Sequence, residues 1–417
     1  IEFTRAIESG RNLNDIRKIP QLGFYMDGRC RIKDAVILNS YERCCKDKVA
    51  FAENFHVVET YANMLQPPVL VEPVGSGYVQ INPTWPPATQ EEMDSFWDLP
   101  FTKLPHPRYK GKHIPAFEMI KFSVNTHRGC FGGCNFCTIA AHQGKFIQSR
   151  SEESIISEIK ALGDLPGFAG NISDVGAPTA NMYGMAGKNQ ELCAKCRRKS
   201  CLFPSPCRNM DRSHARLLDL YARIAQVKGI RHAYIGSGIR YDLFEDNNYL
   251  REVILNHTSG RLKVAPEHTE DGVLKLMRKP SFRLFEQLNS DFKSICEKEG
   301  LRYQLIPYFI SSHPGCRECD MKALSERVLG RLHFDLEQVQ DLTPTPMTLS
   351  SVMFYTGENP YTGEKVFVAR SQDDKRRQKS YFFKEQPRPQ RGNAPQRGSS
   401  PARQRDNRKT KYKPTKK

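Results

Sequence analysis

The chain contains the run His127-Arg128-Gly129-Cys130-Phe131-Gly132-Gly133-Cys134-Asn135-Phe136-Cys137, which places three cysteines within eight residues. Cysteine thiolates on short loops of this kind hold iron–sulfur clusters. The glycines agree with this interpretation, because a chain that wraps closely around a cluster needs positive φ angles. Three cysteines leave one iron of a four-iron cluster without a protein ligand. The alternative is a zinc site, in which His127 or His142 supplies the fourth ligand.

Working outward from this run, the sequence alternates between strand and helix patterns. Residues 119–125 alternate apolar and polar side chains and predict a strand, and residues 151–162 predict a helix with Ser151 as its N-cap. A late strand is predicted at residues 349–355. Repeated β/α units favour a parallel sheet, so we expect an α/β fold with a partial TIM-type (β/α)6 barrel at residues 116–370. A doubly wound open sheet is the alternative.

The N-terminal region, residues 1–115, carries no catalytic motif. Residues 41–64 predict one amphipathic helix. The sequence does not begin with Met, so we expect this extension to be the remnant of an upstream domain in a chain that has lost its N-terminus.

The C-terminal residues 371–417 hold 16 Lys or Arg and 4 Asp or Glu, which accounts for +12 of the total net charge of +17. Few residues in this segment could be buried, so we predict a disordered basic tail. Such a tail either keeps the protein in solution or contacts RNA phosphates. No apolar run reaches the length that spans a bilayer, so we expect no membrane partner.

A second group of cysteines lies in an insertion predicted at residues 181–210. Its four members are Cys193, Cys196, Cys201 and Cys207. Four thiolates can complete either an auxiliary iron–sulfur cluster or a zinc site. The chain has 13 cysteines, an odd number, and no secretion signal, so metal binding in a cytoplasmic protein is preferred over disulfides.

The motif Cys-x3-Cys-x2-Cys, with Phe136 before the last cysteine, resembles the signature of the radical S-adenosylmethionine (radical SAM) enzymes. Longer runs resemble the YgiQ-type subfamily. They are found at residues 128–144, 176–182, 236–242, 263–269, 307–315 and 355–360. The resemblance covers about residues 20–370.

This resemblance implies a 4Fe–4S cluster bound by Cys130, Cys134 and Cys137, with S-adenosylmethionine (SAM) on the open iron. It implies reductive cleavage of SAM to a 5′-deoxyadenosyl radical that acts on an unknown substrate. The electron would come from a one-electron donor such as flavodoxin or ferredoxin. Phe136 is expected to lie along the adenine. Where the family carries Gly-Gly-Glu, this sequence has Asp174-Val175-Gly176-Ala177, so carbonyls near Val175 and Gly176 are expected to bind the SAM amino group.

Polar residues follow the predicted strands, where barrel active sites lie. Arg240 is a candidate for the SAM carboxylate or ribose, and Glu267 for a ribose hydroxyl. His268 and His313 are candidates for catalytic proton handling. Two other functions stay open at this point. One is an RNA-modifying radical SAM enzyme of the methylthiotransferase kind, and the other is a non-enzymatic iron–sulfur or zinc protein.

Overall fold

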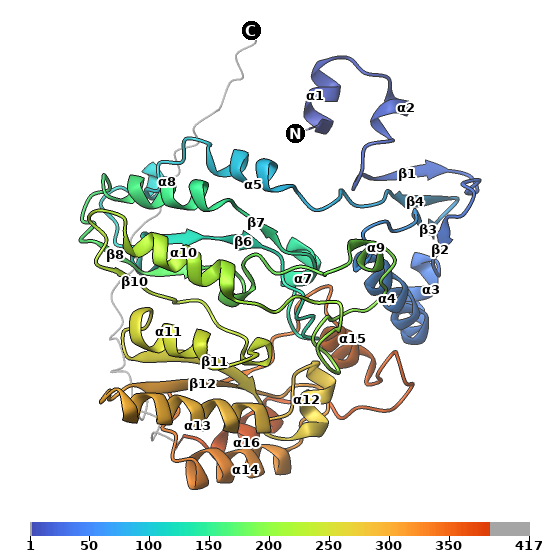
Figure 1. Cartoon of the computed structure of the whole chain (residues 1–417). Coiled ribbons are helices and arrows are strands. Elements are labelled where there is room, and N and C mark those ends of the chain that lie inside the picture. The colour runs from blue at the N-terminus through green and yellow to red at the C-terminus, as the bar shows by residue number, and fades with distance from the viewer. Residues whose placement is uncertain (1, 384–417) are drawn as a thin grey trace, which may run out of the picture. The chain divides into compact units, whose positions relative to one another are not determined.

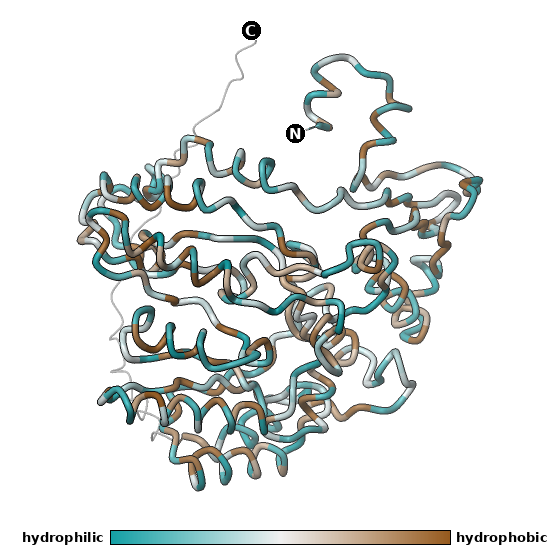
Figure 2. The backbone as a smooth tube through the Cα atoms, viewed as in Figure 1, coloured by the Kyte–Doolittle hydropathy of each residue, from teal (hydrophilic) through white to brown (hydrophobic). Residues whose placement is uncertain are grey.

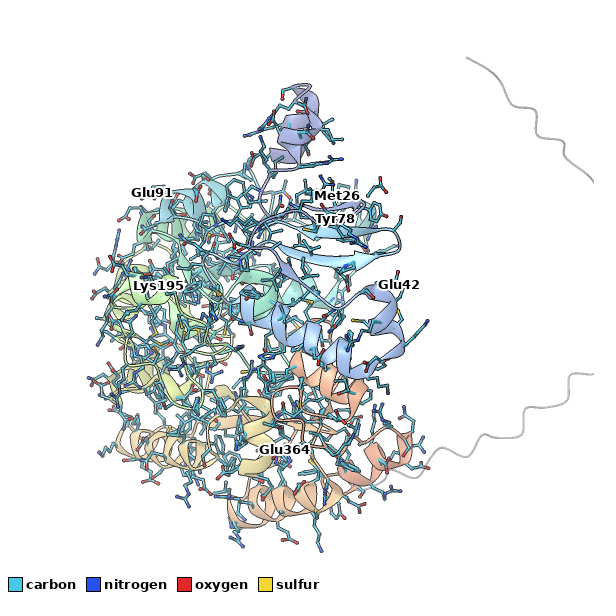
Figure 3. The ribbon with its side chains drawn as sticks, turned by 90° about the vertical axis from the view of Figure 1, so that its right-hand side faces the viewer. Met26, Glu42, Tyr78, Glu91, Lys195 and Glu364 are labelled. Carbon is cyan, nitrogen blue, oxygen red and sulfur yellow. The ribbon has the colours of Figure 1, made fainter. Side chains whose placement is uncertain are left out.

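The computed structural model describes residues 2–383, and the N-terminal part of these builds a small sheet flanked by helices (Figure 1). The strands are β1 (Gly23–Asp27), β2 (Val36–Ile37), β3 (Leu70–Val74) and β4 (Gly77–Ile81), in the order β1-β4-β3-β2. Met26 of β1 pairs with Tyr78 of β4 (Figure 3). The helices are α1 (Glu2–Glu8), α2 (Leu13–Ile16), α3 (Tyr41–Lys46), α4 (Lys48–Ala62) and α5 (Gln90–Trp97).

The single helix predicted at residues 41–64 is instead two helices, α3 and α4. Asp47 separates them, because its backbone is extended and its side chain accepts a hydrogen bond from the Val49 amide at 2.8 Å. Asp is a strong N-cap residue, so it starts a new helix where the amphipathic pattern alone predicts continuation.

The rest of the fold alternates strands and helices, as predicted. Its strands are β5 (Ser123–Asn125), β6 (His127–Arg128), β7 (Gln148–Ser149), β8 (Asn171–Ile172), β9 (Asp174–Gly176), β10 (His232–Ala233), β11 (Arg261–Glu267), β12 (Gln304–Ser311) and β13 (Val339–Asp341). The pairs β5–β9, β8–β10, β11–β12 and β12–β13 are parallel. Among the described residues these strands form separate small sheets and no closed barrel, so the TIM-type barrel stays a prediction.

Helices cover these strands and bury an apolar face against them. They are α6 (Pro115–Ile120), α7 (Ile139–Gln143), α8 (Glu152–Leu162), α9 (Gln190–Ala194), α10 (Ala215–Ala225), α11 (Asn248–Asn256), α12 (Asp271–Met277), α13 (Arg283–Lys298), α14 (Glu318–Ser325), α15 (Leu349–Thr356) and α16 (Gln372–Ser380). Ser151 caps α8, as predicted, and Ile155, Ile159 and Leu162 are fully buried. Each of these side chains stabilises the fold by about 1.5–3 kcal/mol. Hydrophobic and hydrophilic residues alternate along these helices (Figure 2).

Two predicted strands were wrong in part or whole. Residues 115–120 form helix α6, and only Ser123–Asn125 is a strand; Pro115 explains the difference, because proline is favoured in the first helical turn. Residues 349–356 form helix α15 rather than a strand. Thr348 caps this helix and Gly357, at φ 78°, ends it. A short apolar run does not by itself distinguish a helix from a strand.

The predicted tail begins with folded structure, so the boundary at residue 371 is corrected. Helix α16 starts with a capping box in which Ser371 and Asp374 bind each other's amides. Gln378 is buried, accepts a hydrogen bond from the Ser312 amide at 2.7 Å and donates one to the Cys316 carbonyl at 2.9 Å. The predicted disorder and RNA contacts of residues 384–417 lie outside the described residues. Within the part described, no helix is both long and apolar enough to cross a membrane.

Candidate functional site

The cysteine loop follows strand β6, and the pairing of β6 with β7 closes it at its base. β6 and β7 pair antiparallel, and the Cys130 amide donates to the Gly144 carbonyl at 3.1 Å. Gly129, at φ 93°, has the Phe146 carbonyl oxygen 2.2 Å from where a Cβ would lie. Gly133, at φ 60°, has the Lys199 carbonyl oxygen at 2.5 Å from the same point. Glycine is therefore required at both positions, as the sequence predicts.

The three thiols of this loop lie close enough to influence one another. Burial raises the pKa of Cys137 to about 11, and the neighbouring Cys134 and Cys130 thiols add to the shift. Burial also raises the pKa of Cys130, while the Arg240 guanidinium acts in the opposite direction. Within residues 2–383, no group of three or more His, Cys, Asp or Glu side chains is arranged around a single metal ion. A four-iron cluster needs a different arrangement, because each thiolate binds its own iron. Three half-buried thiols on one loop fit that donor set.

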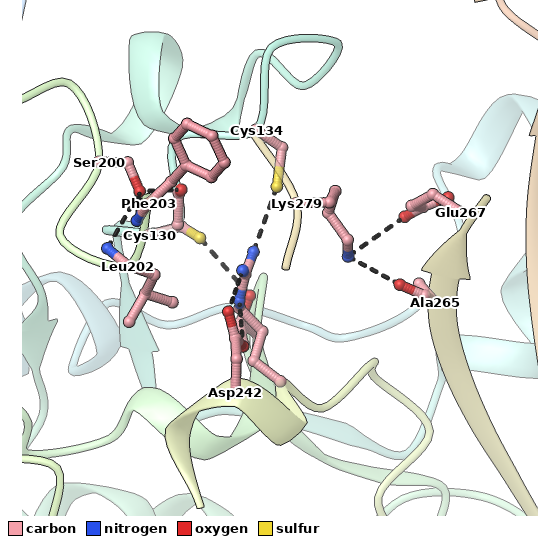
Figure 4. Close-up of polar contacts among 12 residues, drawn as sticks. Cys130, Cys134, Ser200, Leu202, Phe203, Asp242, Ala265, Glu267 and Lys279 are labelled. Atoms are coloured by element: carbon pink, nitrogen blue, oxygen red, sulfur yellow. Dashed lines mark hydrogen bonds and ion pairs between the residues drawn. The ribbon is translucent and has the colours of Figure 1, made fainter. Parts of the chain in front are cut away.

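Arg240 connects the cysteine loop to the segment after β10, between Cys134 and Asp242, which Figure 4 labels. Its Nη1 donates to Cys134 Sγ at 3.2 Å, and its Nε and Nη2 donate to the two Asp242 carboxylate oxygens at 2.9 and 2.5 Å. Burial alone raises the pKa of Asp242, but the Arg240 guanidinium more than offsets this and holds it below its usual range. A permanent cation is thus fixed beside the thiols. Sequence reasoning found Arg240 but missed Asp242, although the Arg-x-Asp spacing was visible.

Glu267 is the last residue of β11 and lies on the same side of the fold as Arg240 and the cysteine loop. Its Oε1 lies 3.7 Å from Lys279 Nζ, which also donates to the Ala265 carbonyl at 2.7 Å (Figure 4). Burial raises the pKa of Glu267, and Lys279 and Arg240 oppose that rise. Glu267 has a positive φ of 68°, which is uncommon for a residue other than glycine. The structure therefore brings Glu267, Arg240 and the cysteine loop together, as expected.

The other groups predicted to contact the cofactor are less accessible, because they are buried or already hydrogen-bonded. The Gly176 carbonyl accepts a hydrogen bond from the Thr126 amide at 2.9 Å, and the Val175 amide donates to the Tyr234 carbonyl at 2.8 Å. Val175 is buried. Phe136 is half-buried and meets the His313 ring edge-on, with 6.4 Å between ring centroids. Thr179, which the sequence reasoning missed, places its hydroxyl 3.5 Å from Cys130 Sγ.

Both predicted histidines are buried, with each ring nitrogen next to a partner. His268 Nδ1 accepts from the Glu270 amide at 3.0 Å, and its Nε2 lies 3.5 Å from Cys316 Sγ. His313 Nδ1 lies 2.8 Å from the Pro314 carbonyl oxygen, and its Nε2 lies 2.6 Å from the Ser350 hydroxyl. Burial lowers the pKa of His268 to about 3 and that of His313 to about 4. This arrangement favours a structural role for both over proton transfer.

The N-terminal region contributes to this site, although no site residue was predicted there. Phe55 and Glu59 of α4 line a small cavity together with Cys134, Cys137, Lys199 and Arg278. The two Glu59 carboxylate oxygens accept hydrogen bonds from Arg278 at 2.6 and 3.0 Å, and Tyr361 also donates to Glu59. Helix α4 is therefore held against the cysteine loop by residues that are far apart in the sequence.

The second group of cysteines surrounds a separate cavity. Cys193, Cys196, Cys201 and Cys207 line it together with Lys145 and Arg198. Burial raises the pKa of Cys201 to about 11; Lys145 opposes this rise, while Cys196 and Cys207 add to it. The Cys193 pKa is raised by burial and by the same two thiols. The structure thus brings these four predicted ligands together.

Comparison with known proteins gives the same family as the sequence motif. Residues 1–123 match the Radical SAM N-terminal family model, and residues 337–389 match a domain of unknown function, DUF3362. A UPF0313 protein from Bacteroides thetaiotaomicron is 52% identical over 361 residues, which are 84% of this chain and 58% of that protein. The UPF0313 protein YgiQ from Escherichia coli K12 is 44% identical over 355 residues, 84% of this chain and 48% of that protein.

The chain therefore spans between about half and three fifths of the length of these curated relatives. Among solved structures, the radical SAM methyltransferase TsrM from Kitasatospora setae, with cobalamin and a [4Fe-4S] cluster bound, is 13% identical. The match covers 68% of this chain and 49% of that chain with a TM-score of 0.41, too low to argue from. On the matching N-terminal family model and the identity to the curated relatives, the chain belongs to the radical SAM proteins of the UPF0313 (YgiQ) type.

Proposed function

We propose that this protein is a radical SAM enzyme whose cluster is held by Cys130, Cys134 and Cys137. The observation that carries the proposal is the convergence of three thiols on one glycine-shaped loop beside Arg240. When bound, a reduced 4Fe–4S cluster supplies the electron that splits the C–S bond of SAM, giving methionine and a 5′-deoxyadenosyl radical that takes a hydrogen atom from a substrate. The electron comes from a donor of the flavodoxin or ferredoxin class.

The residues around the loop have separate tasks in this proposal. Arg240, fixed by Asp242, donates a hydrogen bond to the Cys134 sulfur and stabilises its thiolate. Glu267 offers carboxylate oxygens for a ribose hydroxyl, with Lys279 balancing its charge. Helix α4 and Phe55 cover the loop and exclude water from it. Phe136 and carbonyls near Val175 and Gly176 complete the proposed SAM site.

The test is anaerobic reconstitution followed by a measurement of 5′-deoxyadenosine in the presence of dithionite and SAM. We expect product from the unaltered chain and none from Cys134→Ala. The control is Cys45→Ala, which removes an exposed cysteine outside both groups and should leave product formation unchanged. A chain that holds the cluster but never cleaves SAM, with or without a donor protein, would contradict the proposal.

A further inference from the structure

The second group of cysteines faces a cavity large enough for more than one metal ion. Its volume is about 520 Å³, and all four thiols line it. A tetrahedral zinc ion draws its sulfurs to about 2.3 Å from a single point. In a cluster each thiolate binds a different iron, so the ligands lie further apart around a multi-atom core. The cavity therefore offers the room that a cluster needs.

The surroundings of these thiols suit a negatively charged cluster. The Arg198 amide donates to Cys196 Sγ at 3.4 Å, and the Asn209 side-chain amide donates to Cys193 Sγ at 3.3 Å. N–H groups aimed at sulfur stabilise iron–sulfur clusters and set their potentials. Lys145 lines the same cavity; it is only 2% exposed, and its Nζ donates to the Arg198 carbonyl at 2.8 Å. A buried cation is costly unless a negative charge lies nearby.

The segment that lines this cavity contacts the main cysteine loop. The Cys201 amide donates to the Phe131 carbonyl at 3.0 Å, and Phe131 follows Cys130 in the chain. The Ser200 hydroxyl donates to the Gly132 carbonyl at 2.6 Å (Figure 4). Cys130 of the first group and Cys201 and Cys207 of the second pack against the same hydrophobic cluster, which contains Phe131. Two hydrogen bonds and one aromatic residue thus connect the two groups.

We propose that Cys193, Cys196, Cys201 and Cys207 hold an auxiliary iron–sulfur cluster, which passes single electrons through the Phe131 segment to the main cluster. The auxiliary site stands on its own residues, whereas the relay rests on the proposed function. In each step one electron moves from a reduced flavodoxin or ferredoxin to the auxiliary cluster, which is reoxidised when that electron reaches the main cluster. No bond forms or breaks in this transfer.

The site is tested in the full chain by removing the main ligands. The triple variant Cys130→Ala, Cys134→Ala and Cys137→Ala should retain about half of the iron and sulfide of the unaltered chain after anaerobic reconstitution. It should also give an electron paramagnetic resonance signal on reduction with dithionite. The matched variant with Ser at all four auxiliary positions should lose the other half. Zinc without sulfide in the triple variant would overturn the site. So would a triple variant without iron, together with a fourfold variant that keeps all the iron of the unaltered chain.

Folding and the relay need their own controls. If the fourfold variant unfolds in a thermal melt, the single variant Cys207→Ser replaces it. In a folded variant, reduction of the main cluster by a reduced flavodoxin or ferredoxin should slow several-fold, while reduction by dithionite should not change. Equal rates with the protein donor would overturn the relay without touching the auxiliary site. Loss of SAM cleavage alone, with both clusters present, would contradict the proposed function and leave this inference standing.

Discussion

The two cysteine-rich segments are positioned by different means. The loop at residues 130–137 is fixed by its own backbone, with a hairpin at its base and glycines where no side chain fits. The segment at residues 193–207 has one short helix, α9, and is fixed by side chains such as Ser200 and Arg198 that bind backbone carbonyls. A loop that is fixed by close backbone contacts tolerates few substitutions. A segment that is fixed by side-chain hydrogen bonds tolerates more. The difference suggests that the first loop sets the geometry and the second adapts to it.

The largest expected effect comes from the buried Arg240–Asp242 ion pair, which lies beside the first loop and not beside the second segment. Asp242→Ala leaves Arg240 buried without its carboxylate, so the free energy of unfolding should fall by about 3–5 kcal/mol. Glu299→Ala removes the partner of a more exposed arginine, Arg251, and should cost about 0–1 kcal/mol. Urea unfolding of both variants measures the difference. Equal losses would mean that the pair does not anchor the first loop.

Low pH should lower the free energy of unfolding through a buried histidine beside the first loop, His313. The pKa of His313 is about 4 in the folded state, below its ordinary value of 6.5. The unfolded chain therefore binds a proton that the folded chain does not, and stability falls as the pH drops from 6.5 to 4. His313 alone should contribute about 1.4 kcal/mol per pH unit to this slope, and the buried His268 adds to it. His313→Gln should flatten it by that amount in urea titrations, and an unchanged slope would contradict the assignment. No histidine lines the second cavity.

A substitution at Gly133 should break the contact between the two segments. Alanine there meets the Lys199 carbonyl at 2.5 Å and keeps a φ of 60°, so stability should fall by about 2–4 kcal/mol. Gly363→Ala is the control, because Gly363 has a φ of 71° but no atom within 4 Å of the added Cβ. It should cost about 1–2 kcal/mol. Thermal unfolding compares the two, and similar losses would mean that the close contact is unimportant.

The smallest effect is expected from Ser200, which binds the first loop to the second segment. Its hydroxyl donates to the Gly132 carbonyl and accepts from the Leu202 and Phe203 amides at 3.0 Å. Ser200→Ala leaves these groups unpaired and should cost about 1–2 kcal/mol. Ser95→Ala, at an exposed position of α5, should change stability by about 0.5 kcal/mol or less. Calorimetry of both variants distinguishes a real connection from a surface contact.

The sequence was most informative where a local pattern determines the structure. The glycines of the first loop and the cap and apolar face of α8 follow from residue type and spacing. Residues 349–355 were mistaken for a strand, because their apolar run lacks a clear period and the decisive Gly357 cap lies outside it. The Glu59–Arg278 pair was not predictable, because it joins residues 219 positions apart. Lys279 was missed because its contact with Glu267 appears only in three dimensions, whereas Asp242 could have been found from its spacing to Arg240.

The central claim is that Cys130, Cys134 and Cys137 hold a cluster with an open iron that binds SAM. Electron paramagnetic resonance of the anaerobically reduced protein, with and without SAM, tests it most directly. The background for this experiment is the fourfold serine variant, which removes any signal from the second group of cysteines, Cys193, Cys196, Cys201 and Cys207. The account predicts a cluster signal in this variant that changes shape when SAM is added and is absent after Cys134→Ala. A signal that ignores SAM, or no iron signal at all, would contradict it.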